Sequence, residues 1–294
     1  MRVLVTGASG VFGREIMRRL VARGHAVVGL SRRRPAGLLD RAEFVAADIR
    51  DADAVARAAD GCDAVAHCAW VVGALHDDDQ ERRINVGGTE NAIEALRRAG
   101  GRRIVFASSA TAYGPQPRTP GGPVGPVVVD EATPLRPHPG HPYARHKAEV
   151  EALLASSGLD AVAIRTAVVL GRSIDNRVWS FMAAPVQLVA RDRSPATWQV
   201  VHADDVGRFF VDACEAGPAG PVNLAAPGTF TTEELARVFG RRLLRTPERV
   251  LRRTVQAAWN RRAFDVSPAE LDFVLDMPLM DTGRLTQEWR FTCA

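Results

Sequence analysis

Two residues near the middle of the chain have the types and spacing of a proton-transfer pair. Tyr143 and Lys147 are four residues apart in the segment YARHK, so both side chains lie on one face if the segment is helical. A phenol with a pKa of about 10 is a poor base at neutral pH, but a neighbouring ammonium lowers that pKa. Tyr143 could then exchange a proton with a substrate hydroxyl or carbonyl. The alternative is an ordinary pair on a surface helix.

Two serines precede this pair in the segment FASSATAYG. Ser108 and Ser109 stand where a predicted strand, 103–108, ends, and ligands of parallel sheets bind at the carboxyl ends of the strands. A hydroxyl group there can hydrogen-bond a reacting oxygen and help to polarise it. The alternative is that both serines only cap the strand. Tyr113, the other of the two tyrosines, is expected to be structural or to line the substrate site.

Three glycines near the start of the chain predict a dinucleotide site. Gly7, Gly10 and Gly13 follow the apolar run 3–5 and open a predicted helix. Gly7 permits a tight turn, Gly10 lets the backbone approach phosphates, and Gly13 lets the helix pack closely on the strand. The helix N-terminus then offers free N–H groups and a partial positive charge to a pyrophosphate. The alternative is a plain glycine turn.

The end of the second predicted strand indicates which dinucleotide binds. An acidic residue there would hold the ribose 2′-hydroxyl of NAD, but the strand 26–30 is followed by Ser31 and Arg32. These side chains could hydrogen-bond and neutralise a 2′-phosphate, which favours NADP over NAD. The alternative is a basic surface turn.

Short apolar segments alternate with amphipathic ones through the first half of the chain. Such alternation predicts an α/β fold with a parallel, doubly wound sheet, and nearly continuous apolar strands indicate burial on both faces. The predicted strands are 2–6, 26–30, 43–47, 63–68, 103–108 and 161–165, and the predicted helices are 11–23, 51–59, 79–99 and 143–157.

The proline-rich segment 114–142 interrupts this alternation. It holds half of the 18 prolines, so it can be neither a helix nor a central strand. A loop of this length is usually functional or poorly ordered. Beyond residue 166 the pattern is looser, with strands predicted at 199–202 and 221–225 and helices at 203–216, 231–240 and 267–276. We therefore assign 1–168, joined by 199–226, to a dinucleotide-binding core, and 169–198 with 227–294 to a small substrate-binding lobe.

Composition narrows the class of protein. The 294 residues suit one large domain or two interlocked lobes, and 46% hydrophobic with 24% charged residues is an ordinary globular balance. The net charge of +4 is small and the basic residues are scattered, so no nucleic-acid partner is expected. No apolar run approaches the roughly 20 residues of a membrane span, and no signal peptide is recognised, so the expected location is the cytoplasm. The four cysteines lack metal-ligand spacing, which argues against a metal site.

Several features occur together in an order that resembles one protein family. They are the TGASGVFG loop, Asn85 in INVGGTENAIEAL, SSATAYG, YARHK, and the later segments VHADDVGRFF and VNLAAPGTFTTEEL. Jointly they are similar to the extended short-chain dehydrogenases/reductases (SDRs), often called the NAD-dependent epimerase/dehydratase family. The resemblance covers nearly the whole chain and implies a Rossmann-like fold with Ser109, Tyr143 and Lys147 as the catalytic residues. It implies cofactor contacts at Gly7, Ser9, Gly10, Val11, Phe12, Gly13, Ser31, Arg32, Asp48, Ile49, Cys68, Ala69, Trp70, Asn85, Ala107, Tyr143 and Lys147. It also implies a homodimer formed through helices 79–99 and 143–157.

Three hypotheses for the function follow. The leading one is NADP(H)-dependent reduction of a carbonyl, or oxidation of the matching alcohol, on a small-molecule substrate. The second is an NAD-dependent nucleotide-sugar epimerase, but Trp198 occupies the position where such members of the resembled family carry a diphosphate-binding arginine. Arg191 and Arg193 stand nearby and could substitute. The third is a non-catalytic protein that senses NADP. His138 and His141, in the proline-rich loop, are expected to be solvated, and the alternative is that they line the substrate pocket.

Overall fold

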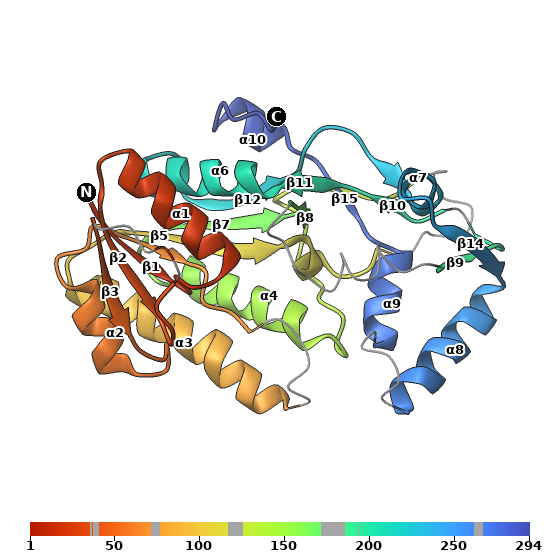
Figure 1. Cartoon of the computed structure of the whole chain (residues 1–294), viewed down its shortest axis with the longest axis horizontal. Coiled ribbons are helices and arrows are strands. Elements are labelled where there is room, and N and C mark those ends of the chain that lie inside the picture. The colour runs from red at the N-terminus through yellow and green to blue at the C-terminus, as the bar shows by residue number, and fades with distance from the viewer. Residues whose placement is uncertain are drawn as a thin grey trace.

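A seven-stranded parallel sheet forms the centre of the molecule (Figure 1). The computed structural model describes residues 1–35, 37, 41–71, 77–116, 126–171, 186–193, 195–261 and 267–294. The strand order is β12-β7-β5-β4-β1-β2-β3, and every neighbouring pair is parallel. The strands are β1 (Arg2–Thr6), β2 (Ala26–Ser31), β3 (Ala42–Ala46), β4 (Ala64–His67), β5 (Arg103–Ser109), β7 (Asp160–Thr166) and β12 (Gly220–Leu224). This sheet confirms the predicted α/β fold.

Helices cover both faces of the sheet because its inner strands are apolar on each side. One face is covered by α1 (Val11–Ala22) and α6 (Ala203–Glu215), and the other by α2 (Ala52–Ala59), α3 (Asp78–Arg98) and α4 (Pro142–Ala155) (Figure 1). Ile16 and Phe209 bury their side chains in the first core, and Leu96 and Leu154 do so in the second. These helices agree with the predicted ones to within a few residues at each end.

From β1 the chain builds the sheet first toward one edge, through β2 and β3, and then toward the other, through β4 and β5. β1 therefore pairs with β2 on one side and with β4 on the other. Ligands of open α/β sheets bind outside the carboxyl ends of the strands at such a point. Thr6, Ser31, His67 and Ser109 are the last residues of β1, β2, β4 and β5, so they lie along this edge.

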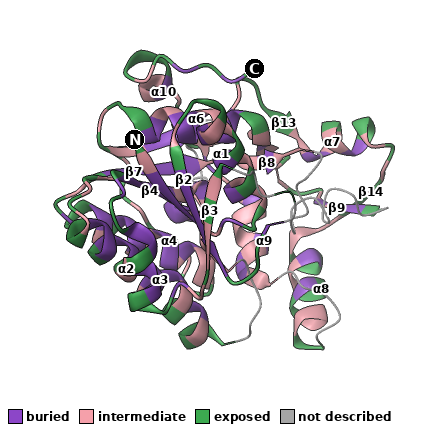
Figure 2. Ribbon diagram, turned by 60° about the vertical axis from the view of Figure 1, so that its left-hand side comes forward, coloured by how far each residue is buried: buried purple, intermediate pink, exposed green. Residues whose placement is uncertain are grey.

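A smaller group of elements, residues 186–193 and 230–276, lies apart from the sheet, and we call it the peripheral unit. It contains β9 (Val186–Ala190) paired with β14 (Arg242–Thr246), and β13 (Phe230–Thr231) with α7 (Thr232–Val238), α8 (Glu248–Asn260) and α9 (Pro268–Leu275). The sequence patterns did not predict β9, β14 or α8. Figure 2 shows buried residues along the central strands, whereas β14 and α8 carry many exposed and half-buried residues.

Three further short strand pairs lie outside the central sheet, and one of them includes β13 of this unit. β8 (Val168–Leu170) pairs with β11 (Val200–His202), β10 (Thr197–Trp198) pairs with β13, and β6 (Val128–Val129) pairs with β15 (Leu279–Met280). β6 lies in the proline-rich segment, of which 117–125 fall outside the described residues. After α10 (Gly283–Gln287) the chain returns to the sheet, because Leu285 and Phe291 pack in the core on the α1–α6 face. The division made from the sequence had placed these last residues with the lobe.

Candidate active site

The glycine loop between β1 and α1 has the geometry that a pyrophosphate needs. Gly7 has a φ of +68°, and a Cβ there would lie 2.7 Å from the backbone of Cys68 and Ala69. A Cβ on Gly13 would collide with the Gly7 carbonyl oxygen. The N-cap of α1, Gly10, offers no side-chain cap, and no acidic residue follows in the first turn, whereas an aspartate caps α2 and α3. The start of α1 therefore presents backbone N–H groups to an anion. Ser9, Val11 and Phe12 lie in the same turn.

The segment that follows β4 is fixed by two polar side chains. The Thr6 hydroxyl accepts hydrogen bonds from the N–H groups of Cys68 and Ala69, at 3.2 Å each. The Asn85 side chain accepts from the Val71 N–H at 2.8 Å and donates to the Val71 carbonyl at 3.4 Å. The backbone is therefore held on both sides of Trp70, directly beside the glycine loop.

His67 connects the Thr6 side chain, through Thr89, with the backbone carbonyl of Asn85. The Thr89 hydroxyl donates to the Asn85 carbonyl at 2.6 Å, so it accepts from His67 Nε2 at 2.9 Å. His67 Nδ1 then accepts from the Thr6 hydroxyl at 2.8 Å. Complete burial, with the Lys147 charge nearby, lowers the pKa of His67 to about 3, so the imidazole is neutral. The chain of hydrogen bonds runs from β1 through β4 to α3.

The three side chains predicted to be catalytic come together at the carboxyl end of β5. The Ser109 hydroxyl accepts from the Thr111 N–H at 3.2 Å and from the Thr111 hydroxyl at 3.0 Å, so its own proton is directed to the Tyr143 phenol. Lys147 Nζ donates to the Ala107 carbonyl at 2.5 Å and lies 5.3 Å from the centre of the Tyr143 ring. Burial raises the pKa of Tyr143 to about 12, and the hydrogen bond from Ser109 opposes this rise. Ser109 thus caps the turn after the strand and also contacts the phenol.

His141 lies in this site, although its sequence context had suggested a solvated residue. Its Nδ1 accepts from the Ala144 N–H at 3.1 Å, so it caps the helix that carries Tyr143. Its ring is 6.1 Å from the Tyr143 ring and 6.5 Å from the ring of Phe273 on α9. His138 lies 3.4 Å from Asp272 of the same helix, so the proline-rich segment contacts the peripheral unit beside the phenol.

Comparison with known proteins agrees with this geometry. Residues 3–225 match the family described as the NAD dependent epimerase/dehydratase family. The chain belongs to that family. The family's description names epimerases and dehydratases that depend on NAD, and the parallel sheet of this chain has the Rossmann-like order expected for it.

Relatives in the epimerase/dehydratase family differ in length and activity. An uncharacterised protein of Mycobacterium tuberculosis is 39% identical over 293 residues, which is 99% of this chain but 28% of that longer protein. The 3-diazoavenalumate denitrifying reductase of a Streptomyces species is 39% identical over 82% of each chain. Among solved structures, UDP-glucose 4-epimerase of Thermus thermophilus in complex with NAD has a TM-score of 0.67 and 27% identity, covering 84% of this chain and 86% of the other.

The end of β2, the place where dinucleotide-binding folds contact the ribose 2′ position, is basic. Arg32 is exposed and its charge acts on Asp48, whose carboxylate also accepts from the Arg50 guanidinium at 2.9 and 3.0 Å. The hydrogen bonds from Arg50, with the charge of Arg32, hold the pKa of Asp48 below its usual range. The Ser31 hydroxyl donates to the Arg33 carbonyl at 2.8 Å, so its proton is used within the turn.

Ile49, another residue predicted to contact the cofactor, packs against α3. Its side chain is 6% exposed and would lie 2.7 Å from a Cβ at Gly88. Its carbonyl accepts from Asn91 Nδ2 at 3.0 Å. Ile49 therefore contributes mainly to the apolar core between the sheet and α3, below the carboxyl edge of the sheet.

The arginines considered as diphosphate ligands are placed differently from that expectation. Trp198 is buried and its indole N–H donates to the Thr232 hydroxyl at 2.9 Å. Arg193 pairs with Asp276, lies 3.4 Å from Glu248, and donates to the Leu275 carbonyl at 3.1 Å. Arg193 thus fastens β9 to α8 and α9. Arg191 is exposed.

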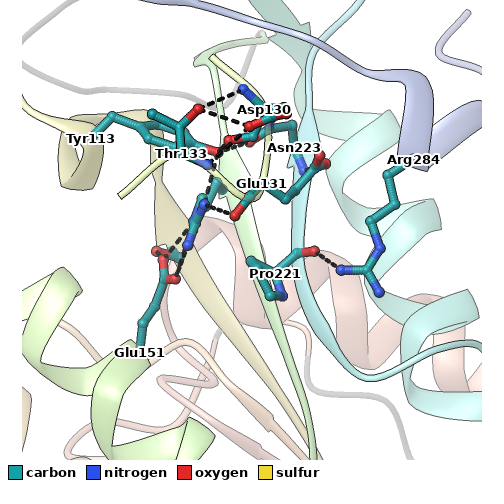
Figure 3. Close-up of polar contacts among 10 residues, drawn as sticks. Tyr113, Asp130, Glu131, Thr133, Glu151, Pro221, Asn223 and Arg284 are labelled. Carbon is teal, nitrogen blue, oxygen red and sulfur yellow. Dashed lines mark hydrogen bonds and ion pairs between the residues drawn. The ribbon is translucent and has the colours of Figure 1, made fainter. Parts of the chain in front are cut away.

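A buried ionic network connects α4, the helix that carries Tyr143 and Lys147, with β7 and β12 (Figure 3). Glu151, one turn after Lys147, accepts from Arg165 Nη2 at 2.7 Å and from the Ser108 hydroxyl at 2.5 Å. Arg165 also donates to the Tyr113 hydroxyl at 2.8 Å, and that oxygen lies 2.7 Å from Asn223 Oδ1. Tyr113 is fully buried and therefore structural, one of its two expected roles.

Two features of the site were missed in the sequence patterns. Lys147 is the single lysine of the sequence, and the rest of its 38 lysine and arginine residues are arginines. A count of lysines would have singled it out. The second is Trp70, which was taken only as a cofactor contact and which lies directly over the Lys147 ammonium.

The part of the chain that the structure describes contains neither a membrane-spanning helix nor a metal-binding cluster. None of its helices combines the length and the apolar content needed to cross a bilayer. The same residues contain no group of three or more His, Cys, Asp or Glu side chains placed to hold a metal ion.

Proposed function

We propose that this chain is an NADP(H)-dependent oxidoreductase that reduces a carbonyl group, or oxidises the matching alcohol, on a small-molecule substrate. The observation that carries the proposal is the cluster of Ser109, Tyr143 and Lys147 beside the glycine loop and the basic end of β2. The nicotinamide supplies or accepts the hydride when the cofactor is bound. The residues that would hold the cofactor are those of the glycine loop, Arg32 and the segment from Cys68 to Trp70.

The protonation state of Tyr143 supports the direction of reduction. With a pKa raised to about 12 by burial, the phenol carries its proton at neutral pH. Tyr143 can then give that proton to a carbonyl oxygen, while the Ser109 hydroxyl donates a hydrogen bond to the same oxygen or to the phenolate that remains. The Lys147 ammonium stabilises the phenolate after the proton has left.

The charge around Arg32 supports NADP over NAD. The described residues directly after β2, 32–35, include no carboxylate, and the nearby Asp48 is already engaged by Arg50. A 2′-phosphate at this place would meet a guanidinium, whereas the 2′-hydroxyl of NAD would find no free acceptor of the usual kind. The likeness to a Streptomyces reductase over 82% of the chain also favours net reduction.

The test is a fluorescence titration of cofactor-free protein with NADPH and with NADH. We expect NADPH to bind at least about tenfold more tightly, which corresponds to roughly 1.4 kcal/mol. Arg32→Asp should reverse the order. Arg237→Asp, an equal charge change at an exposed position on α7, should leave the ratio unchanged. A carbonyl library with NADPH then identifies substrates, with Tyr143→Phe as the inactive control.

Two outcomes would overturn the proposal. Tighter binding of NADH, or NAD retained in the purified protein, would favour the nucleotide-sugar epimerase, for which the likeness to UDP-glucose 4-epimerase is the supporting observation. The pairing of Arg193 with Asp276 and Glu248 counts against that activity, because Arg193 is not free for a diphosphate. Tight NADPH binding without turnover of any carbonyl compound would favour the NADP-sensing alternative.

We further propose a homodimer through α3 and α4. The two helices are adjacent, and Arg82–Glu149 and Arg145–Asp78 ion pairs connect them. The exposed large hydrophobic residues of the described chain lie on other elements, so the interface would be polar and sensitive to salt. Sedimentation equilibrium at low and high salt measures this, and a monomer at both would exclude the dimer.

A further inference from the structure

The one lysine of the chain lies in a box of aromatic rings. Lys147 is 2% exposed, and its Nζ is 3.5 Å from the centre of the Trp70 ring and 4.6 Å from that of Phe106. The Tyr143 ring follows at 5.3 Å, and one N–H donates to the Ala107 carbonyl. At 3.5 Å the ammonium is in direct contact with the indole face, the strongest of the aromatic partners for a cation.

The charged and titratable groups that face Lys147 do not neutralise it. They are His67 and Cys68 at the end of β4, and Tyr143 and Glu151 on its own helix. His67 is neutral, and burial raises the pKa of the Cys68 thiol to about 12. The Glu151 carboxylate is bound by Arg165 and Ser108 instead. Within the described chain, no carboxylate forms an ion pair with Nζ.

Trp70 is held in place by its backbone rather than by its indole N–H. The hydrogen bonds from Thr6 and Asn85 fix the peptide groups on either side of it. Its ring contacts Phe106 at 5.5 Å and the Tyr143 ring, edge to face, at 6.1 Å. The indole Nε1 is buried and has no acceptor among the described residues. The group that Trp70 offers to this site is therefore the face of its ring.

We propose that Trp70 is a positioning residue for Lys147: its indole face binds the ammonium and holds it against the Ala107 carbonyl, beside the Tyr143 phenol. The catalytic consequence rests on the proposed oxidoreductase function, but the contact itself does not. A compact ammonium can rest on one ring and still present N–H donors elsewhere, whereas a guanidinium spreads five donors over a plane. This difference gives a physical reason for a lysine at 147 in a chain that otherwise uses arginine.

The contact also offsets the penalty of burial. Removal from water lowers the pKa of Lys147 well below its usual range. An aromatic face stabilises the protonated form and so acts in the opposite direction. Loss of the ring should therefore make Lys147 lose its proton at a lower pH, provided that the site stays dry.

The single lysine makes a direct measurement possible. Protein labelled with ¹³C-lysine gives one side-chain Cε signal, and its shift against pH reports the Lys147 titration. We expect the midpoint to fall by about one pH unit in Trp70→Leu and by less in Trp70→Phe. Trp289→Phe, which removes an indole on the far side of the sheet, should titrate as the wild type.

Fluorinated tryptophan separates the ring's charge distribution from its bulk, because truncation can admit water, which raises the pKa of a buried lysine. Wild-type protein containing mono- and difluorotryptophan keeps the shape of the ring but weakens its negative face. We expect the Lys147 midpoint to fall stepwise with the number of fluorines, and not in Trp70→Phe grown on the same medium. A Lys147 midpoint independent of fluorination would overturn the proposal. Trp70 would then only exclude water from Lys147.

Turnover provides the second readout. With NADPH and a reducible substrate, the alkaline limb of kcat should move to lower pH by the same interval as the Lys147 midpoint. If the midpoint shifts but no carbonyl compound is reduced, the contact stands and the proposed function fails. If carbonyl compounds are reduced but the pH profile of kcat is the same in the wild type and in the Trp70 variants, the positioning role is wrong and the proposed function stands.

Discussion

The central sheet and the peripheral unit are stabilised in different ways. In the sheet and its helices the buried polar side chains include His67, Lys147, Glu151 and Arg165, each with partners from other elements. In the peripheral unit the described buried polar side chains are Gln187 and Thr232, neither of them ionisable. Its apolar cluster is small, consisting of Leu251, Val255, Leu271 and Leu275.

The ion pairs of the peripheral unit are less buried than the Arg165–Glu151 pair, although Arg193 and Asp276 are only 18% and 11% exposed. Arg252 bridges Glu248 and Asp272, and these side chains are 27% to 40% exposed. Large hydrophobic residues are exposed as well, for example Val238 at 78% and Leu244 at 55%. From this comparison we infer that side chains are held most rigidly where polar groups are buried and have several partners, as at the carboxyl edge of the sheet. The part expected to select the substrate has fewer such constraints, so its residues can change at lower cost in stability.

The largest effect is expected from breaking the buried ion pair between Glu151 of α4 and Arg165 of β7. Glu151→Ala leaves the Arg165 guanidinium, 4% exposed, without its carboxylate. We expect a loss of about 3–5 kcal/mol in the free energy of unfolding, measured with urea. The double variant Glu151→Leu with Arg165→Met should recover much of that loss, because an apolar pair removes the orphaned charge. A loss below about 1 kcal/mol in the single variant would mean that water reaches this pair.

The assignment of the chemistry to the sheet edge predicts a specific kinetic defect. Tyr143→Phe removes only the phenol oxygen, so kcat for carbonyl reduction should fall about a thousandfold, or roughly 4 kcal/mol. The dissociation constant for NADPH should stay within about twofold. Tyr113→Phe is the matched control, because it removes a hydrogen bond to Arg165 away from the reaction. It should lower stability by about 1–3 kcal/mol and leave kcat nearly unchanged. Similar kcat values for both variants would contradict the assignment.

The same contrast separates what could be predicted from the sequence from what could not. The strands of the sheet were predicted closely because burial on both faces leaves a nearly continuous apolar run, as in β1 and β5. The contact of Tyr143 with Ser109 was also within reach, since the family resemblance implied both as catalytic residues. In the peripheral unit β14, RLLRT, has no such pattern, because a strand of a half-exposed pair need not be apolar.

Side-chain partners across long intervals were out of reach. Nothing local to His67 indicates that it bridges Thr6 and Thr89, and nothing near Arg193 indicates its pairing with Asp276. His141 was misjudged for the same reason. Its place in a proline-rich segment favoured a solvated residue, and the sequence did not show that His141 caps the next helix and neighbours Phe273.

A buried neutral histidine predicts a pH dependence of stability that belongs to the sheet region. The folded pKa of His67 is about 3, below the value of about 6.5 expected in the unfolded chain. Between these values the unfolded state binds the extra proton, so stability is complete above about pH 6.5 and falls as the pH drops toward 3. The loss approaches about 1.4 kcal/mol per pH unit. Urea unfolding between pH 4 and 7 measures the slope of the unfolding free energy against pH. In His67→Gln this slope should be smaller than in the wild type by the contribution of one proton.

Equal slopes for wild type and His67→Gln would show that His67 is protonated in the folded state. The tautomer that links Thr6 to Thr89 would then be wrong.

The smallest effect is expected in the peripheral unit, from the counterpart of the first substitution. Asp272→Ala removes a carboxylate that Arg252 contacts, but the guanidinium keeps Glu248 and remains partly in water. We expect a loss of about 0–1 kcal/mol, which shrinks further at high salt. A double-mutant cycle with Arg252→Ala isolates the pair. A coupling near 3 kcal/mol would place this unit in the same class as the sheet, and the lower cost of changing its residues would no longer follow. A coupling below 1 kcal/mol, together with a large loss for Glu151→Ala, would establish that the burial of an ion pair decides how strongly it stabilises each region. The number of ion pairs would then matter less.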